Sequence, residues 1–102
     1  MIYGLSETDI NLILDVFALH SAVEKVILFG SRAKGNYKPG SDIDLVMMGS
    51  NVSFDEFLTL MSQLEELNLP YHIDLINHET IKDSDILDHI KRVGVTVYEK
   101  AV

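Results

Sequence analysis

The sequence has no cysteine, and it has half as many basic as acidic residues, with 8 Lys and Arg against 16 Asp and Glu. The absence of cysteine excludes disulfide bonds, thiolate zinc sites and catalysis by a thiol nucleophile. No apolar run approaches the roughly 20 residues that a membrane-spanning helix needs. Residues 1–7 lack the basic and apolar stretches of a secretory signal. We therefore expect a protein of a bacterial or archaeal cytoplasm, without membrane association.

The charge of the chain limits its partners. A net charge of −8 repels the phosphate backbone of nucleic acids, so we expect no stable nucleic-acid binding. Three of the 8 basic residues nevertheless lie in one short stretch, at Arg32, Lys34 and Lys38. A local basic cluster in an acidic protein indicates a small anionic ligand.

The spacing of apolar residues predicts a single domain of alternating helices and strands over residues 1–102. Helices are expected over 7–20 behind a Ser6 cap, over 31–34, after the Ser53–Glu56 capping box, and after a Ser84 cap. Strands are expected over 25–29, 41–48, 71–76 and 95–98. In the helix after Ser53, the residues expected to face the core are Phe54, Phe57, Leu58, Met61, Leu64 and Leu67.

The connections predict how these strands pair. The stretch 42–76, with a helix between two strands, is long enough for a right-handed crossover between parallel strands. The link 29–42 is shorter and permits an antiparallel pair. The expected fold class is therefore α/β, with a small mixed β-sheet packed with helices.

The segment from Phe29 to Gly35 joins an expected strand to a short helix. Gly30 lets the backbone turn and a ligand approach closely, and Ser31 adds a hydroxyl donor near backbone N–H groups. A helix N-terminus of this kind attracts phosphate, and Arg32 would add positive charge. Taken alone, a Gly-Ser pair is more often an ordinary turn.

Two carboxylates lie in the expected strand 41–48. Because side chains alternate along a strand, Asp42 and Asp44 project to the same face. Ile43, Leu45 and Met47 take the opposite face. Like charges this close repel each other, and a divalent cation that prefers oxygen ligands, magnesium or manganese, would reverse that cost. The alternative is a solvated edge face that carries two acids.

Asp74 is a further single acid, within the expected apolar strand 71–76. If this strand lies beside strand 41–48, Asp74 joins Asp42 and Asp44 in one cluster of three carboxylates. The alternative is an acid on the wet face of a strand end, and on Asp74 alone the two interpretations are equally good. His72 shares the strand face of Asp74, where a structural role is favoured over substrate orientation.

Together these residues resemble a known signature. Gly30-Ser31, Ala33 and Gly35, followed by Ser41-Asp42-Ile43-Asp44-Leu45, are similar to the GSxAxG and SDxDL motifs of the polymerase-beta-like nucleotidyltransferase superfamily. Asp74 matches the third metal-binding aspartate of that pattern. The resemblance covers residues 25–76. It is greatest to the minimal nucleotidyltransferase (MNT) group, whose stand-alone domains occur in two-component HEPN–MNT systems. The implied fold is the nucleotidyltransferase fold.

The resemblance implies a site and a reaction. Gly30 and Ser31 would hold the triphosphate of ATP, with Arg32 and Ser41 completing the nucleotide-binding set. Two Mg²⁺ ions would stabilise the attacking and leaving oxygens of the displacement. Family members transfer a nucleoside monophosphate to a hydroxyl and release pyrophosphate. The implied catalytic and metal-binding residues are Asp42, Asp44 and Asp74.

The resemblance also implies a partner. In HEPN–MNT pairs the MNT protein is an antitoxin that adenylylates a tyrosine of the HEPN toxin, so a helical HEPN-family partner is expected, with homo- or hetero-oligomerisation left open. One alternative is a non-catalytic subunit that binds nucleotide or masks the HEPN protein by contact, although the three aspartates favour an enzyme. Another is an enzyme that modifies a small-molecule hydroxyl, as aminoglycoside nucleotidyltransferases do, but those enzymes carry a further substrate domain.

Overall fold

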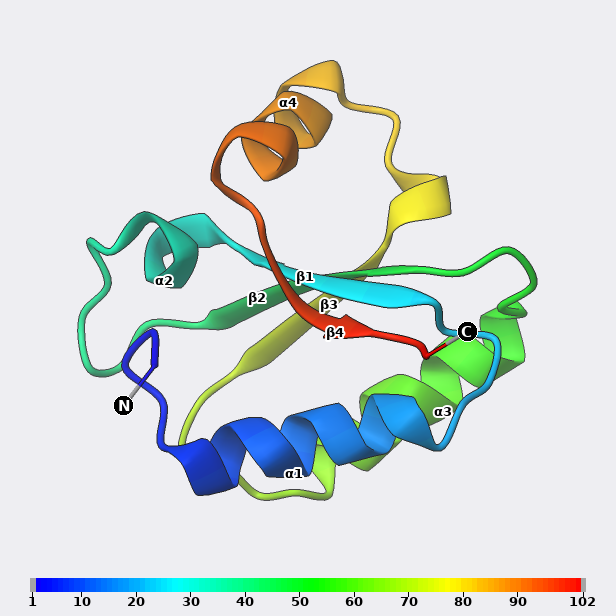
Figure 1. Ribbon diagram of the computed structural model, residues 1–102, viewed down its shortest axis with the longest axis horizontal. Coiled ribbons are helices and arrows are strands. Elements are labelled where there is room, and N and C mark those ends of the chain that lie inside the picture. The colour runs from blue at the N-terminus through cyan, green and yellow to red at the C-terminus, as the bar shows by residue number, and fades with distance from the viewer. Residues whose placement is uncertain (1, 102) are drawn as a thin grey trace.

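The computed structural model describes residues 2–101, which form four α-helices, one 3-10 helix and four strands (Figure 1). Along the chain these are α1 (Glu7–Ala18), β1 (Lys25–Phe29), α2 (Gly30–Lys34), β2 (Ile43–Met48), α3 (Phe54–Glu65), β3 (Ile73–Asn77), η1 (His78–Thr80), α4 (Ser84–Val93) and β4 (Val95–Glu99). The predicted order of helices and strands is confirmed. None of the helices in this part of the chain is long and apolar enough to cross a membrane.

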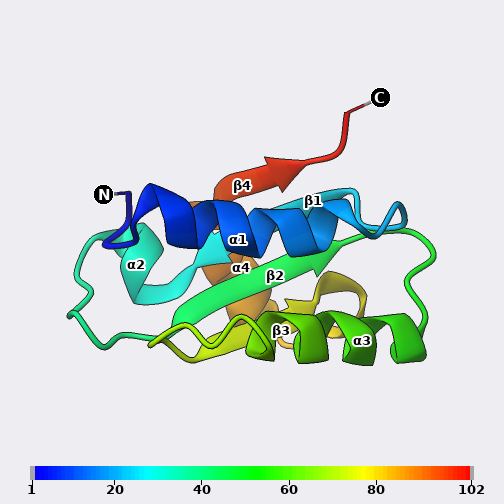
Figure 2. The ribbon, with the colours of Figure 1, turned by 90° about the horizontal axis from the view of Figure 1, so that it is seen from below.

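The four strands form one mixed sheet in the order β3-β2-β1-β4. β2 and β3 are parallel and are connected through α3, whereas β1 runs antiparallel to both β2 and β4. The sheet therefore has both the parallel pair and the antiparallel pair that the lengths of the connections allow. Helices α1 and α3 cover one face of the sheet and α4 stands on the other, with α2 at the end of β1 (Figures 1 and 2). The α/β class with a small mixed sheet is confirmed.

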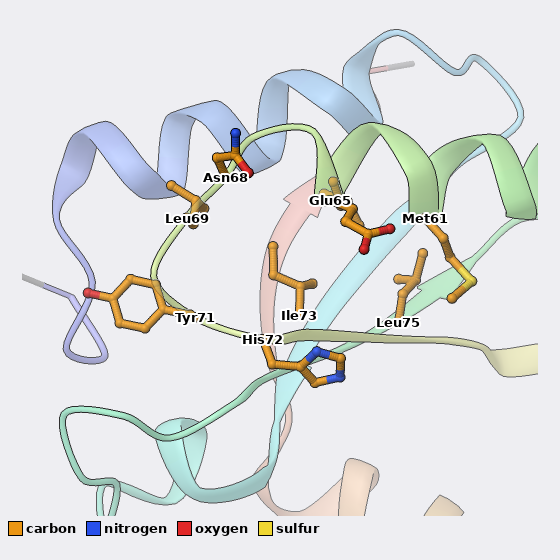
Figure 3. Close-up of a pocket in the computed structure, with 9 residues that line it drawn as sticks. Met61, Glu65, Asn68, Leu69, Tyr71, His72, Ile73 and Leu75 are labelled. Carbon is orange, nitrogen blue, oxygen red and sulfur yellow. The ribbon is translucent and has the colours of Figure 1, made fainter.

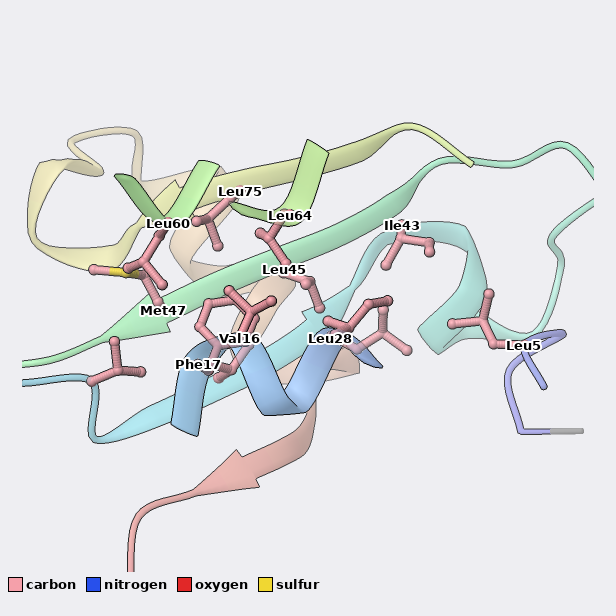
Figure 4. Packing of buried hydrophobic residues seen from close by; sticks show 13 residues of the cluster. Leu5, Val16, Phe17, Leu28, Ile43, Leu45, Met47, Leu60, Leu64 and Leu75 are labelled. Carbon is pink, nitrogen blue, oxygen red and sulfur yellow. The ribbon is translucent and has the colours of Figure 1, made fainter. Parts of the chain in front are cut away.

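The main hydrophobic core lies between the sheet and helices α1 and α3 (Figure 4). Ile43, Leu45 and Met47 of β2 are buried in it together, as the alternation along the strand predicts. Phe17 of α1 and Leu60 of α3 are fully buried in the same cluster. A smaller cluster on the opposite face consists of Phe29, Val46 and Ile90. Alternate residues of β2 point to this second face, and Asp44, which lies between the core residues Ile43 and Leu45, therefore projects there.

Helix α3 corrects one expectation. Leu64 is buried as predicted, but so is Leu60, which lies outside the predicted apolar stripe. Helix α3 packs over β3, which is the edge strand of the sheet. Phe57 and Leu67 of the predicted stripe are partly buried against the same core, whereas the other three residues of the stripe are exposed. Those exposed residues are Phe54, Leu58 and Met61, with exposed fractions of 74%, 44% and 42%.

Two strands begin later than predicted. β2 starts at Ile43 rather than at position 41, because Ser41 closes a turn in which its hydroxyl accepts a hydrogen bond from the Lys38 N–H. β3 starts at Ile73 rather than at position 71. Asp42 therefore lies in the loop that leads into β2, not within the strand.

The helix caps agree with prediction in two of three cases. The side chains of Ser6 and Ser53 accept hydrogen bonds from the first turns of α1 and α3. Helix α4 is capped instead by Asp83, whose carboxylate accepts a hydrogen bond from the Asp85 N–H, so Ser84 is the first helical residue. Helix α1 ends at Ala18 rather than at position 20.

Candidate functional site

The turn after β1 has the geometry that the sequence predicts. Helix α2 begins directly behind Phe29, the last residue of β1. Gly30 has a φ of 73°, in the left-handed region that favours glycine. No side chain of the described residues caps the first turn of this helix. The backbone N–H groups of the turn are therefore free of a side-chain acceptor.

Gly30 and Asp44 bring the two sequence motifs into contact. Phe29 and Asp44 are paired across the antiparallel strands β1 and β2, which places the Asp44 side chain against the next residue, Gly30. A Cβ atom at position 30 would collide with the Asp44 carboxylate. Glycine is therefore required here for two reasons, its positive φ and the space that the carboxylate occupies.

The carboxylates come together across β2 and β3. Asp44 pairs with Asp74 on the neighbouring parallel strand. Asp44 is half-buried, whereas Asp42 and Asp74 are exposed. Burial, and then the charges of Asp74 and Asp42, raise the pKa of Asp44 above its ordinary value of 3.8. The predicted adjacency of the two strands is confirmed, and the three carboxylates are close enough to act on one another electrostatically.

Two histidines border the carboxylates. The charges of His72 and His89 act on Asp44 in the opposite sense and lower its pKa. His89 comes from α4, and its ring packs edge-on against Phe29 with the ring centroids 6.2 Å apart. Sequence reasoning weighed His72 but gave His89 no role. No spacing pattern relates a residue of α4 to β1, so only the position of α4 over the sheet reveals it.

The donor set suits a hard divalent cation, because it offers carboxylate oxygens and no sulfur. A bound cation would also offset the burial and the repulsion from Asp74 and Asp42 that together raise the pKa of Asp44. As the side chains are placed, no group of three His, Cys, Asp or Glu residues within 2–101 is close enough to hold one ion. The pairing of Asp44 with Asp74 is built into the sheet, whereas a three-ligand site requires side-chain or loop movement, with Asp42 in the loop before β2.

Arg32 does not take the place expected for a nucleotide-binding residue. Its side chain is buried, and its guanidinium donates hydrogen bonds to the carbonyls of Tyr3, Pro39 and Ser41. A guanidinium directed at protein carbonyls does not present its N–H groups to a ligand. The side chain, as it is placed, therefore does not support the expectation of direct nucleotide contact by Arg32. The Arg32 side chain, which follows Ser31 on α2, points into the protein beneath the next loop and not to solvent.

The other predicted contacts in this loop remain predictions. The Ser41 hydroxyl, 2.8 Å from the Lys38 N, is used as an acceptor within the loop, and the residue is partly exposed. Lys34 and Lys38 are exposed. Of the basic cluster seen in the sequence, only these two lysines reach solvent.

A cavity elsewhere on the sheet does not contain the aspartates. It has a volume of about 480 Å³ and lies between α3 and β3 (Figure 3). Its lining includes Met61, Glu65, His72 and Leu75, and none of the three aspartates. Asp42 and Asp74 are exposed at the candidate site, and His72 is a residue of this region that also lines the cavity.

Comparisons with known proteins identify the family of the chain. The sequence profile of the family described as "Polymerase beta, Nucleotidyltransferase" matches residues 11–101. Among curated proteins, the chain is 31% identical over 99 residues to the "Probable protein adenylyltransferase MntA" of Haemophilus influenzae. That alignment covers 85% of this chain and 86% of the relative.

Solved structures show the same fold. A crystal structure of a toxin-antitoxin complex with AMP-PNP has a TM-score of 0.71 at 20% identity, and covers 94% of this chain and 75% of that chain. A Shewanella oneidensis complex of a tri-AMPylated HEPN toxin with its MNT antitoxin has a TM-score of 0.69 at 15% identity, covering 94% and 74%. The predicted nucleotidyltransferase fold is confirmed. From the profile match and the MntA relative, the chain belongs to the polymerase beta nucleotidyltransferase family.

Proposed function

We propose that this protein transfers AMP from ATP to a hydroxyl of a partner protein, a tyrosine of a HEPN-family toxin, and thereby acts as an antitoxin. The curated relatives bear the names of protein adenylyltransferases, and similar folds occur in complexes of toxin and antitoxin. Within this chain, the observation that carries the proposal is the contact of the Gly30 turn with the Asp44 carboxylate. It sets a turn suited to phosphate against a residue suited to a divalent cation.

In the proposed reaction the acceptor oxygen loses its proton and forms a bond to the α-phosphorus of ATP, while the bond from that phosphorus to the bridging oxygen breaks and pyrophosphate leaves. The backbone of Gly30 and the hydroxyl of Ser31 hold the phosphates at the turn. The residues that would hold Mg²⁺ are Asp42, Asp44 and Asp74, and the bound metal would supply charge neutralisation at the attacking and leaving oxygens. Asp74 is exposed beside Asp44, on the side open to an acceptor.

A protein acceptor agrees with the charge of the chain. The net charge of −8 disfavours nucleic acid as acceptor. We place the reaction in the cytoplasm, where ATP and Mg²⁺ are available. Binding to the HEPN protein would bring a tyrosine to the open side of Asp74, so the same contact would serve both recognition and catalysis.

The test is incubation with ATP, Mg²⁺ and a HEPN-family protein, followed by intact-mass measurement. A gain of one or more AMP masses on the HEPN protein, absent with the Asp44→Asn variant, supports the proposal. A stable complex without a mass gain would identify a masking subunit instead. A gain on an aminoglycoside but not on the HEPN protein would identify a small-molecule enzyme.

A further inference from the structure

Arg32 is a buried charge without a counter-charge. Its side chain is 1% exposed, and it is the one buried polar or charged residue among positions 2–101. None of the ion pairs in this part of the chain includes it. Burying a charge is costly, and proteins usually compensate with an opposite charge. The arrangement around Arg32 therefore needs a physical explanation.

Neutral groups solvate this charge. The guanidinium donates to the Ser41 carbonyl at 2.8 and 3.2 Å, to the Tyr3 carbonyl at 2.9 Å and to the Pro39 carbonyl at 3.4 Å. Its carbon lies 5.3 Å from the centre of the Tyr37 ring and 4.9 Å from that of Tyr71. Carbonyl dipoles and aromatic faces stabilise a cation, but they leave its net charge uncancelled.

The same contacts fasten three segments to α2. They reach the loop of residues 37–41 that leads into Asp42, the entry to β3 at Tyr71, and the N-terminal turn at Tyr3. The N-terminal turn is closely fitted, because Gly4 has a φ of 76° and a Cβ atom there would lie 2.8 Å from Arg32 Nη1 and would collide with the Tyr37 ring. Arg32 thus connects the segments that precede Asp42 and Asp74 to the Gly30 turn.

The Arg32 charge lies close to the Gly30 turn in the chain. Arg32 is adjacent to Ser31 on α2, whose first residue, Gly30, contacts the Asp44 carboxylate. A triphosphate at this turn would approach an acidic protein, near three carboxylates. An exposed lysine is screened by water and salt, whereas a buried charge is screened much less and acts over longer distances.

We infer that Arg32 is a positioning residue for the nucleotide triphosphate: without touching it, Arg32 holds the loops around the Gly30 turn and supplies an uncancelled positive potential there. This inference rests on the proposed function, since it requires that ATP binds at the turn. On this inference, the contribution of Arg32 to nucleotide affinity increases with the number of phosphates on the nucleotide. A purely structural role would affect all adenine nucleotides equally.

The test compares dissociation constants, by calorimetry with Mg²⁺, for a non-hydrolysable ATP analogue, ADP and AMP. Arg32→Met should weaken binding of the ATP analogue by about tenfold and of AMP by about twofold or less. The control Lys38→Met removes an exposed charge from the same loop, and should change all three affinities by about twofold or less. Thermal melts of each variant show whether it is folded.

Arg32→Lys keeps the test decisive if Arg32→Met does not fold. The lysine retains the charge but cannot reproduce the bidentate contact with the Ser41 carbonyl. It should weaken binding of all three nucleotides while keeping the preference of the parent protein for ATP over AMP. An equal loss for all three nucleotides in Arg32→Met, or a lost preference in Arg32→Lys, overturns the inference and leaves the proposed function intact. Failure of the unaltered protein to bind the ATP analogue overturns both.

Discussion

The backbone of Gly30 lies directly against the carboxylate of Asp44, although 13 positions separate them in the sequence. The contact exists because β1 and β2 pair antiparallel with Phe29 opposite Asp44, so that the residue after β1 meets the side chain. Asp44 in turn lies opposite Asp74 on β3. One glycine therefore connects the turn suited to phosphate with the carboxylates suited to metal.

Replacement of this glycine tests the contact. Gly30→Ala should lower the free energy of unfolding by about 1–3 kcal/mol, because the positive φ is strained for alanine and the methyl group displaces the Asp44 carboxylate. It should also weaken binding of an ATP analogue. The control is Gly40→Ala, since a Cβ atom there meets no atom within 4 Å, and its change should stay within about 0.5 kcal/mol. Urea unfolding measures both, and equal effects at the two positions would refute the contact as the cause.

The pH dependence of stability follows from Asp44. Folding raises its pKa, so the folded protein holds the proton more tightly than the unfolded chain does, and ionisation of Asp44 costs stability. That cost appears as the pH rises past the ordinary value of 3.8 and is complete above the raised pKa. Asp44→Asn cannot ionise, so in EDTA it should be more stable than the parent at about pH 7, with the advantage gone at about pH 3. Urea unfolding at both pH values checks this, and a variant less stable at neutral pH would show that the carboxylate serves a structural hydrogen bond.

Magnesium should stabilise the parent protein more than it stabilises the aspartate variants. A cation that binds the folded protein raises its melting temperature by ligand linkage. The rise should be largest for the parent and smaller for Asp42→Asn, Asp44→Asn and Asp74→Asn, which should also lose AMP transfer because the amide does not balance the metal charge. Melts of the four proteins with Mg²⁺ and with EDTA measure the effect. An aspartate whose variant keeps the full magnesium-dependent rise does not belong to the metal site.

Two residues of α3 test how that helix packs. Leu60 is fully buried, and Leu60→Ala should lower the free energy of unfolding by about 2–5 kcal/mol through the cavity that it leaves. Phe54 is 74% exposed, so Phe54→Ser should change the free energy of unfolding by only about 0.5 kcal/mol. Chemical denaturation of both variants gives the comparison. A large loss in Phe54→Ser would mean that this ring is covered in solution.

The helices, the strands and the local form of the site could be predicted from the amino-acid sequence. Strand β1, the caps at Ser6 and Ser53, and the turn at Gly30 depend on interactions between residues close along the chain, which periodicity and capping patterns record. The alternation along β2 likewise separates Asp44 from the core residues Ile43 and Leu45. The lengths of the connections were enough to indicate that β2 and β3 can pair in parallel and that β1 and β2 can pair antiparallel, as they do.

The burial of residues whose surroundings come from distant segments could not be predicted and depends on the packing of the whole fold. Arg32 is polar and lies in a basic cluster, yet it is buried because Tyr3 and Tyr71 meet around it. His89 reaches Phe29 because α4 crosses the sheet above β1. The apolar stripe of α3 is half exposed because the sheet ends at β3 beneath it. Burial is a property of what packs against a side chain, and local sequence spacing carries no record of which distant segment that is.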